Sequence, residues 1–214
     1  MSQQTSTFKI SYDIDETSDH TIDAELLGES IISTARLIKN TNKLLNGEEA
    51  DLSIEVKAPE PGSVVVEFIT LLNATGINPL TTLGFVASAI PGTATVLGAL
   101  QELKSRKITL VEEDSDDETA EVKLKLSDNN TINLPPEVAK IALNREVRKN
   151  LEKIINDPSH GASKGQVIFK NENDDDVVNI PINQVNYYKK PSKSVVEDID
   201  EIDEDKEVRF VKVN

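Results

Sequence analysis

The feature that most constrains the fold is a long uncharged stretch in a chain that is otherwise rich in charge. Charged residues make up 29% of the 214 residues, yet none occurs between Glu67 and Glu102. The centre of this stretch, "LTTLGFVASAIPGTATVLGAL" (80–100), combines large apolar side chains with alanine, glycine and threonine. Such a segment must be removed from water, either inside a protein core or inside a membrane.

The Pro91-Gly92 pair divides this apolar segment and leaves both environments open. In a soluble protein the pair predicts two short helices, 79–90 and 92–103, folded as a hairpin against the sheets. As one kinked helix, residues 80–103 would be about 36 Å long at about 1.5 Å per residue, enough to cross a hydrocarbon core of about 30 Å. The small residues would allow close helix packing in a membrane.

We predict that residues 77–107 are the working element of the chain. The residues expected to insert in a membrane or to mediate self-association are Leu80, Leu83, Gly84, Phe85, Val86, Ile90, Pro91, Gly92, Val96, Leu97, Gly98 and Leu100. Lys104, Arg106 and Lys107 follow directly, at the position where a basic anchor would contact anionic lipid headgroups.

The charge and the absence of cysteine exclude several classes of function. A formal net charge of −15 would repel a phosphate backbone, so we expect no nucleic-acid partner. The acids gather at 112–118, 174–176 and 197–207, which is typical of solvated loops or tails. These runs lack the glycine and terminal glutamate of a calcium loop, and a thiolate zinc site needs cysteine. We therefore predict neither a metal nor a cofactor.

Hydrophobic patterning predicts an α+β fold. Period-two alternation predicts strands over 8–14, 51–58, 63–72, 107–113, 121–127, 130–135, 165–171 and 177–182. Helical periodicity predicts two amphipathic helices, 22–46 and 136–156, with buried stripes at Leu27, Ile31, Thr34, Ile38 and Leu45 and at Leu143, Val147, Leu151 and Ile154. The expected architecture is mixed or antiparallel sheets flanked by these helices, with a central apolar helical hairpin.

The order of these elements suggests four regions. Residues 1–76 form a β-α-β-β region, and 77–107 form the uncharged apolar helical segment. Residues 108–190 form a β-rich region with one long helix, and 191–214 form an acidic linker and tail. The tail ends in "EVRFVKVN", which alternates as a strand would.

Three stretches resemble a widespread family of bacterial and phage-borne proteins without an assigned activity. They are "NKLLNGEEADLSIEVKAPEPGSVVVEFI", "LKSRKITLVEED" and "INLPPEVAKIALNREVRKNLEKII". In that family, over a region that corresponds to residues 8–190 here, an apolar glycine-containing segment followed by a basic cluster is similarly placed. The resemblance implies a setting in conflict between phage and host, and it carries over no catalytic residues.

Signatures of catalysis are absent from the sequence. His20 and His160 lie in turn-like sequence without the spacing of a metal site. "SHGASKG" (159–165) lacks the order of glycines, lysine and hydroxyl that a phosphate loop needs. The chain has neither a G-x-S-x-G elbow nor a Ser-x-x-Lys pair in a suitable context. We therefore do not predict an enzyme.

These observations lead to two hypotheses for function. In the first, the chain is a non-enzymatic homo-oligomer that uses 77–107 to insert in or act on an anionic membrane, in phage-host conflict. In the second, it is a soluble protein-binding or structural module in which the same segment is buried core. The N-terminus has no secretory pattern, so we expect a cytoplasmic protein, associated with a membrane upon activation in the first case.

Overall fold

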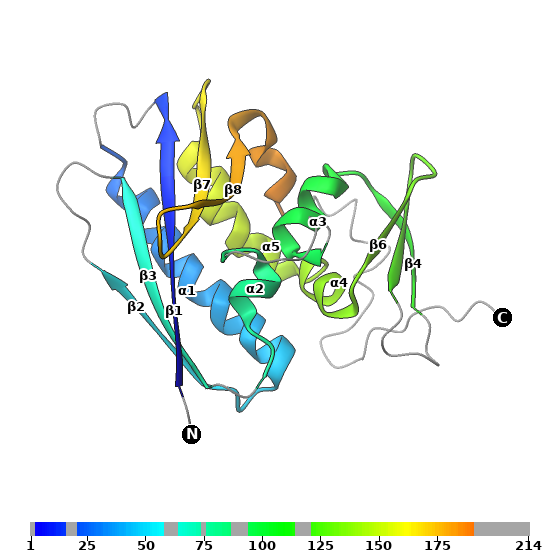
Figure 1. Ribbon diagram of the computed structural model, residues 1–214. Helices are drawn as coiled ribbons and strands as arrows, with labels where there is room; N and C mark the ends of the chain where they lie inside the picture. The colour runs from blue at the N-terminus through cyan, green and yellow to red at the C-terminus, as the bar shows by residue number, and fades with distance from the viewer. Residues whose placement is uncertain are drawn as a thin grey trace.

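The computed structural model describes residues 3–15, 21–57, 64–73, 76–86, 94–113 and 121–190 (Figure 1). Within these ranges the strands form two antiparallel sheets, a larger one with the order β2-β3-β1-β7-β8 and a smaller one with the order β4-β5-β6. The predicted α+β fold with antiparallel sheets is therefore confirmed. Ile90, Pro91, Gly92, His20 and the tail 191–214 lie outside the described residues.

The bounds of the elements follow the sequence pattern closely for most strands and less closely for the helices, and β1 begins at Gln3, five residues before the predicted start. The strands are β1 (Gln3–Ile14), β2 (Leu52–Lys57), β3 (Val65–Asn73), β4 (Ile108–Glu112), β5 (Val122–Leu126), β6 (Thr131–Leu134), β7 (Gly165–Asn171) and β8 (Asp176–Pro181). The helices are α1 (Ala24–Asn46), α2 (Pro79–Leu83), α3 (Val96–Leu103), α4 (Pro136–Ala142), α5 (Arg145–Leu151), the π-helix η3 (Glu152–Asn156) and the 3-10 helices η4 (Asp157–Ser159) and η5 (Ile182–Tyr188).

Strand β1 is the centre of the larger sheet, and it buries one face. Its alternating residues Phe8, Ile10, Tyr12 and Ile14 are all buried, as the period-two pattern predicts. Phe8 stacks on Phe68 of β3, with ring centroids 5.0 Å apart. Helices α1 and α5 lie on one face of this sheet, and α2, α3 and α4 lie between it and the smaller sheet (Figure 1). The core therefore extends from β1 through the helices to the smaller sheet.

Helix α1 is one uninterrupted element, as predicted. The Asp23 side chain accepts hydrogen bonds from the backbone N–H groups of Glu25 and Leu26 and so caps the N-terminus. The helix ends before Gly47, whose φ of 91° is accessible chiefly to glycine. The buried face differs in part from the predicted stripe, because Thr34 and Ile38 are buried together with Leu37, while Leu27, Ile31 and Leu45 are only partly buried.

The prediction of one continuous helix over 136–156 is wrong, because the stretch forms separate helices. It divides into α4 and α5 at Leu143-Asn144, because the Asn144 side chain accepts hydrogen bonds from the N–H groups of Glu146 and Val147 and starts a new helix. Leu143, expected in the buried stripe, is only partly buried. The stretch continues as the π-helix η3, in which the Tyr12 hydroxyl donates to the Ile154 carbonyl over 2.9 Å.

The larger sheet combines strands from two of the predicted regions. Strand β1 pairs with β3 on one side and with β7 on the other, so the hairpin β7-β8 of the predicted region 108–190 extends the sheet formed by residues 1–76. The remaining strands of 108–190, β4 to β6, form the smaller sheet. The two predicted β-rich regions are therefore joined through one sheet and one continuous hydrophobic core.

Candidate functional site

The described residues of the apolar segment are part of the protein core. Leu80, Leu83, Phe85, Val96, Leu97 and Leu100 are fully buried. Gly84 is also buried, while Val86 and Gly98 are partly exposed. The Phe85 ring lies against the larger sheet, 4.6 Å from the Phe169 ring and 5.1 Å from the Phe8 ring, centroid to centroid. Side chains predicted to contact a membrane or another copy are thus packed between sheet and helices.

The helices of this segment are shorter than predicted, for local reasons. Asn78 caps α2, which begins at Pro79 and ends at Leu83 because Gly84 adopts a left-handed conformation with φ of 89°. Thr95 caps α3, its Oγ1 accepting from the Gly98 N–H over 3.2 Å. The first helix therefore stops well before Ile90, and the predicted hairpin of helices 79–90 and 92–103 is not confirmed.

Helix α3 is enclosed by the C-terminal 3-10 helix η5 as well as by α4. The Tyr188 hydroxyl donates to the Leu97 carbonyl, and the amide of Gln101 donates to that of Gln184 over 2.9 Å. Within the described ranges, no helix combines the length and the apolar character required to cross a bilayer.

The predicted basic anchor is dispersed among different structural roles. Lys104 and Lys107 are exposed, and Lys104 ends α3 in a left-handed conformation with φ of 51°. Arg106 is partly buried: its Nη1 lies 2.9 Å from Asp128 Oδ2, and its Nε donates to the Leu103 carbonyl. These contacts fasten the end of α3 to the turn between β5 and β6, so the guanidinium has a structural role within the chain.

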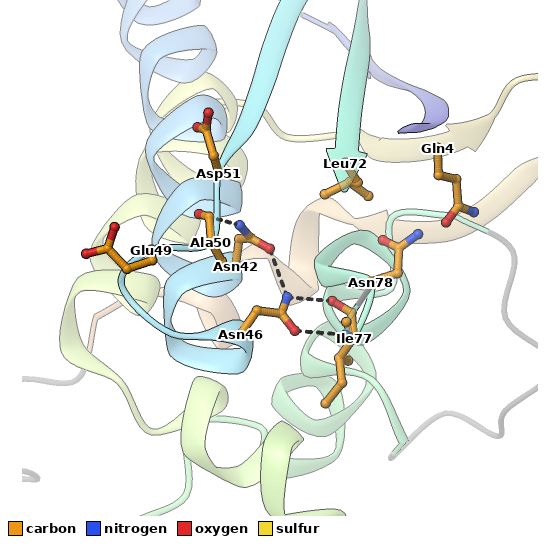
Figure 2. A pocket seen from close by; sticks show the side chains of 10 residues that line it. Gln4, Asn42, Asn46, Glu49, Ala50, Asp51, Leu72, Ile77 and Asn78 are labelled. Carbon is orange, nitrogen blue, oxygen red and sulfur yellow. Dashed lines mark hydrogen bonds between the residues drawn. The ribbon is translucent and has the colours of Figure 1, made fainter. Parts of the chain in front are cut away.

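A solvent-accessible pocket of about 270 Å³ lies where α1 ends beneath the larger sheet (Figure 2). Three segments form it: the last turn of α1 with the loop into β2, the ends of β1 and β3, and the loop into α2. Its lining is dominated by amide side chains, with two carboxylates and two large apolar residues: Gln4, Asn42, Asn46, Glu49, Ala50, Asp51, Leu72, Gly76, Ile77 and Asn78.

Two asparagines one helical turn apart hold the walls of this pocket together. Asn46 pairs with both backbone groups of Ile77, since its Oδ1 accepts from the Ile77 N–H over 2.8 Å and its Nδ2 donates to the Ile77 carbonyl over 2.9 Å. Asn46 also donates to Asn42, which in turn donates to the Ala50 carbonyl (Figure 2). A Cβ at Gly76 would lie 2.5 Å from Asn46 Oδ1, so this pairing requires glycine there.

The polar groups of the pocket that remain available are amides and carboxylates. Asn78 uses its Oδ1 to accept from the Leu80 N–H, and its amino group makes no hydrogen bond to any residue in the described part of the chain. Gln4 is exposed, and no hydrogen bond of its side chain occurs within the described residues. In Figure 2 the carboxylates of Glu49 and Asp51 point away from the asparagine pair.

This arrangement is suited to binding through hydrogen bonds. Amide groups donate and accept but do not titrate, so they can orient a polar ligand without transferring a proton to it. Across the ranges that the structure describes, no group of three or more His, Cys, Asp or Glu side chains could hold a metal ion. The pocket presents the same kind of groups with which Asn46 already binds a peptide backbone.

Sequence reasoning missed this pocket: the predicted segment 77–107 includes two of its residues, Ile77 and Asn78, but neither was among the residues singled out. A signal was present in "NTNKLLN", where Asn42 and Asn46 occur four residues apart at a helix end, and in Gly76, which follows a strand. Asparagines at such positions are also common on exposed helix surfaces, and the partner loop at Ile77 is distant in sequence. The pairing could therefore be recognised only in the folded chain.

No protein-family model, curated protein or solved structure matches the chain. The family resemblance therefore stays a prediction.

Proposed function

We propose that this chain is a non-enzymatic protein-binding module whose apolar segment belongs to the core and whose amide-lined pocket takes up an extended segment of a partner protein. The observation that carries the proposal is the pairing of Asn46 with the N–H and C=O of Ile77. It is the geometry in which an amide side chain recognises an extended backbone. Gln4 and the amino group of Asn78 offer the same chemistry to an incoming chain.

The charge around the pocket favours a basic partner segment. Glu49 and Asp51 lie on the loop at its border, and the whole chain carries a net charge of −15. A field of this sign attracts cationic segments and accelerates their association.

The burial of the apolar segment means that membrane insertion would first have to release it from the core. Exposing a buried Leu, Val or Phe side chain costs about 1.5–3 kcal/mol, so releasing the six fully buried ones would cost on the order of 9–18 kcal/mol. A domain is stable by about 5–15 kcal/mol in total. Hydrocarbon would return this cost after insertion, so it applies to the release step, in which the core has to open. Binding at the pocket leaves the core intact.

The experiment selects peptides from a random phage-displayed library on the immobilised protein and measures the affinity of an enriched peptide. We expect enriched peptides to carry Lys or Arg. Gln4→Ala should weaken their binding about five- to tenfold through the loss of one or two hydrogen bonds. Gln166→Ala is the matched control, because it removes the same side chain from β7 on the opposite face of the sheet, and it should bind like the wild type.

Two results would overturn the proposal. If the selection enriches no peptide, or if Gln4→Ala binds as tightly as the wild type, the pocket is not the binding site. If the folded wild-type protein releases dye from anionic phosphatidylserine vesicles at neutral pH, the membrane hypothesis replaces the one proposed.

A further inference from the structure

Strand β2 lies at one edge of the larger sheet. Within the described residues its one strand neighbour is β3, with which it pairs in unbroken register from Leu52 to Lys57 (Figure 1). An unbroken edge presents a row of unpaired N–H and C=O groups. The edge strand β4 of the smaller sheet differs, because an irregularity between Ile108 and Leu110 interrupts its register.

The side chains of β2 also suggest that its edge has a partner. Leu52 is buried on the core side of the sheet, but Val56, on the same side, is 40% exposed. On the opposite side Ser53, Glu55 and Lys57 are exposed. A second strand beside β2 would cover Val56 and satisfy the free backbone groups.

The charges on β2 identify a second copy of the same strand as a fitting partner. In an antiparallel pair that continues the sheet with both cores on one side, residues of the same face lie opposite each other. A two-fold axis at Ile54 places Lys57 opposite Asp51 of the second copy and, by symmetry, Asp51 opposite Lys57 of the second copy. The same axis places Val56 opposite Leu52 of the second copy.

The two neighbouring registers are less favourable by the same criterion, although an axis at Ser53 would also bring Lys57 opposite Glu49, which lies in the turn before β2. An axis at Ser53 places Asp51 opposite Glu55 of the second copy, and an axis at Glu55 places the two Glu55 carboxylates opposite each other. Opposite charges stabilise a cross-strand pair, and like charges destabilise it. Lys57 Nζ lies 3.4 Å from Glu67 Oε2 of β3, and the Lys57 side chain is 56% exposed. It can therefore also reach a carboxylate across the edge.

We propose that two copies of the chain associate through antiparallel pairing of β2 about an axis at Ile54, which joins two five-stranded sheets into one of ten strands. The interface is isologous, as expected for a two-fold dimer. A single strand pair buries little area, so the dimer is weak, with a dissociation constant in the micromolar range. This association does not rest on the proposed function, although Asp51 belongs both to the pocket border and to the strand pair.

Sedimentation velocity over a concentration series tests the proposal by charge reversal. Lys57→Asp and Asp51→Lys each place like charges opposite each other and should weaken dimerisation at least about tenfold. The double variant Asp51→Lys/Lys57→Asp restores opposite charges in the same register and should recover dimerisation. Lys123→Asp on β5, which makes the same charge change on the smaller sheet, should leave it unchanged. Thermal melting of each variant verifies its fold.

Oxidative cross-linking tests the register directly, because the chain has no cysteine of its own. Ile54→Cys lies on the proposed axis, so two copies bring their thiols together, and a disulfide should form at least about tenfold faster than with Ser53→Cys. A wild type that stays monomeric at all concentrations would overturn the proposal. Dimerisation that the charge reversals leave unchanged, or equal cross-linking at both positions, would do so as well.

Discussion

The apolar segment is conspicuous in the sequence but buried in the structure, whereas β2 is inconspicuous in the sequence but lies at the edge of a sheet. Residues 80–100 form the most apolar stretch of the chain, yet their described large side chains are almost all buried. The six residues of β2 include two charges and look ordinary, yet the strand ends a sheet, and its outer edge has no strand partner among the described residues. The comparison teaches that low polarity indicates what a fold must enclose, whereas capacity for interaction depends on polar groups that the fold leaves without partners.

The largest expected contrast between the two regions comes from the same kind of substitution in each. Leu97→Asp would place an unpaired carboxylate at a fully buried position and should destabilise the protein by more than about 4 kcal/mol. Val56→Asp, at the partly exposed edge, should cost less than about 1 kcal/mol. Urea unfolding at low protein concentration measures both. Similar losses would mean that the edge is buried or that α3 is not core.

A smaller effect is expected where the pocket walls are joined. Asn46→Ala leaves the N–H and C=O of Ile77 without their protein partner, and because this site borders solvent, we expect a loss of about 1–2 kcal/mol. Asn179→Ala on β8 is the control, since Asn179 is exposed, and it should change the stability by less than about 0.5 kcal/mol. The midpoint of urea unfolding, at an unchanged slope, measures the difference. An equal effect of both substitutions would remove the structural role of Asn46.

The strands could be predicted from the sequence because each is specified by its own residues. Alternation of Phe8, Ile10, Tyr12 and Ile14 is enough to place one face of β1 in the core. The helices could be predicted less well, because Leu143 and Val147 continue the helical period across a break that one Asn144 side chain creates. In α1, Leu37 was missed although it is fully buried, since the orientation of the helix is set by its packing on the sheet.

The candidate site could not be predicted, because it depends on contacts between distant segments. Asn46 acquires its role from Ile77, and the pocket arises where the ends of β1, β3 and α1 meet. The apolar segment presents the opposite case. Its composition indicated correctly that it avoids water, but composition alone does not distinguish a core from a membrane.

An effect of about 1 kcal/mol is expected at the start of α3. Thr95→Ala removes the hydroxyl that accepts from the Gly98 N–H, and losses at such caps are typically of this size. Thr95→Ser keeps the hydroxyl and should recover most of the stability. If Thr95→Ser is as unstable as Thr95→Ala, the methyl group, which packs near Gly84, matters more than the cap. Thermal unfolding of the three proteins separates these outcomes.

The smallest expected effect is a pH dependence at the other end of α3, where the predicted membrane anchor lies. Hydrogen bonds from Arg106 and Asn130 lower the pKa of Asp128 from its usual 3.8 to about 2. A carboxyl group with a lowered pKa in the folded state contributes stability above its unfolded pKa, and the contribution is lost as the pH falls from about 4 to about 2. Asp128→Asn should therefore show a shallower loss of stability over this pH window than the wild type. Equal slopes for the wild type and Asp128→Asn would mean that Arg106 is not held by this turn, and its guanidinium would then be available to an anionic surface after all.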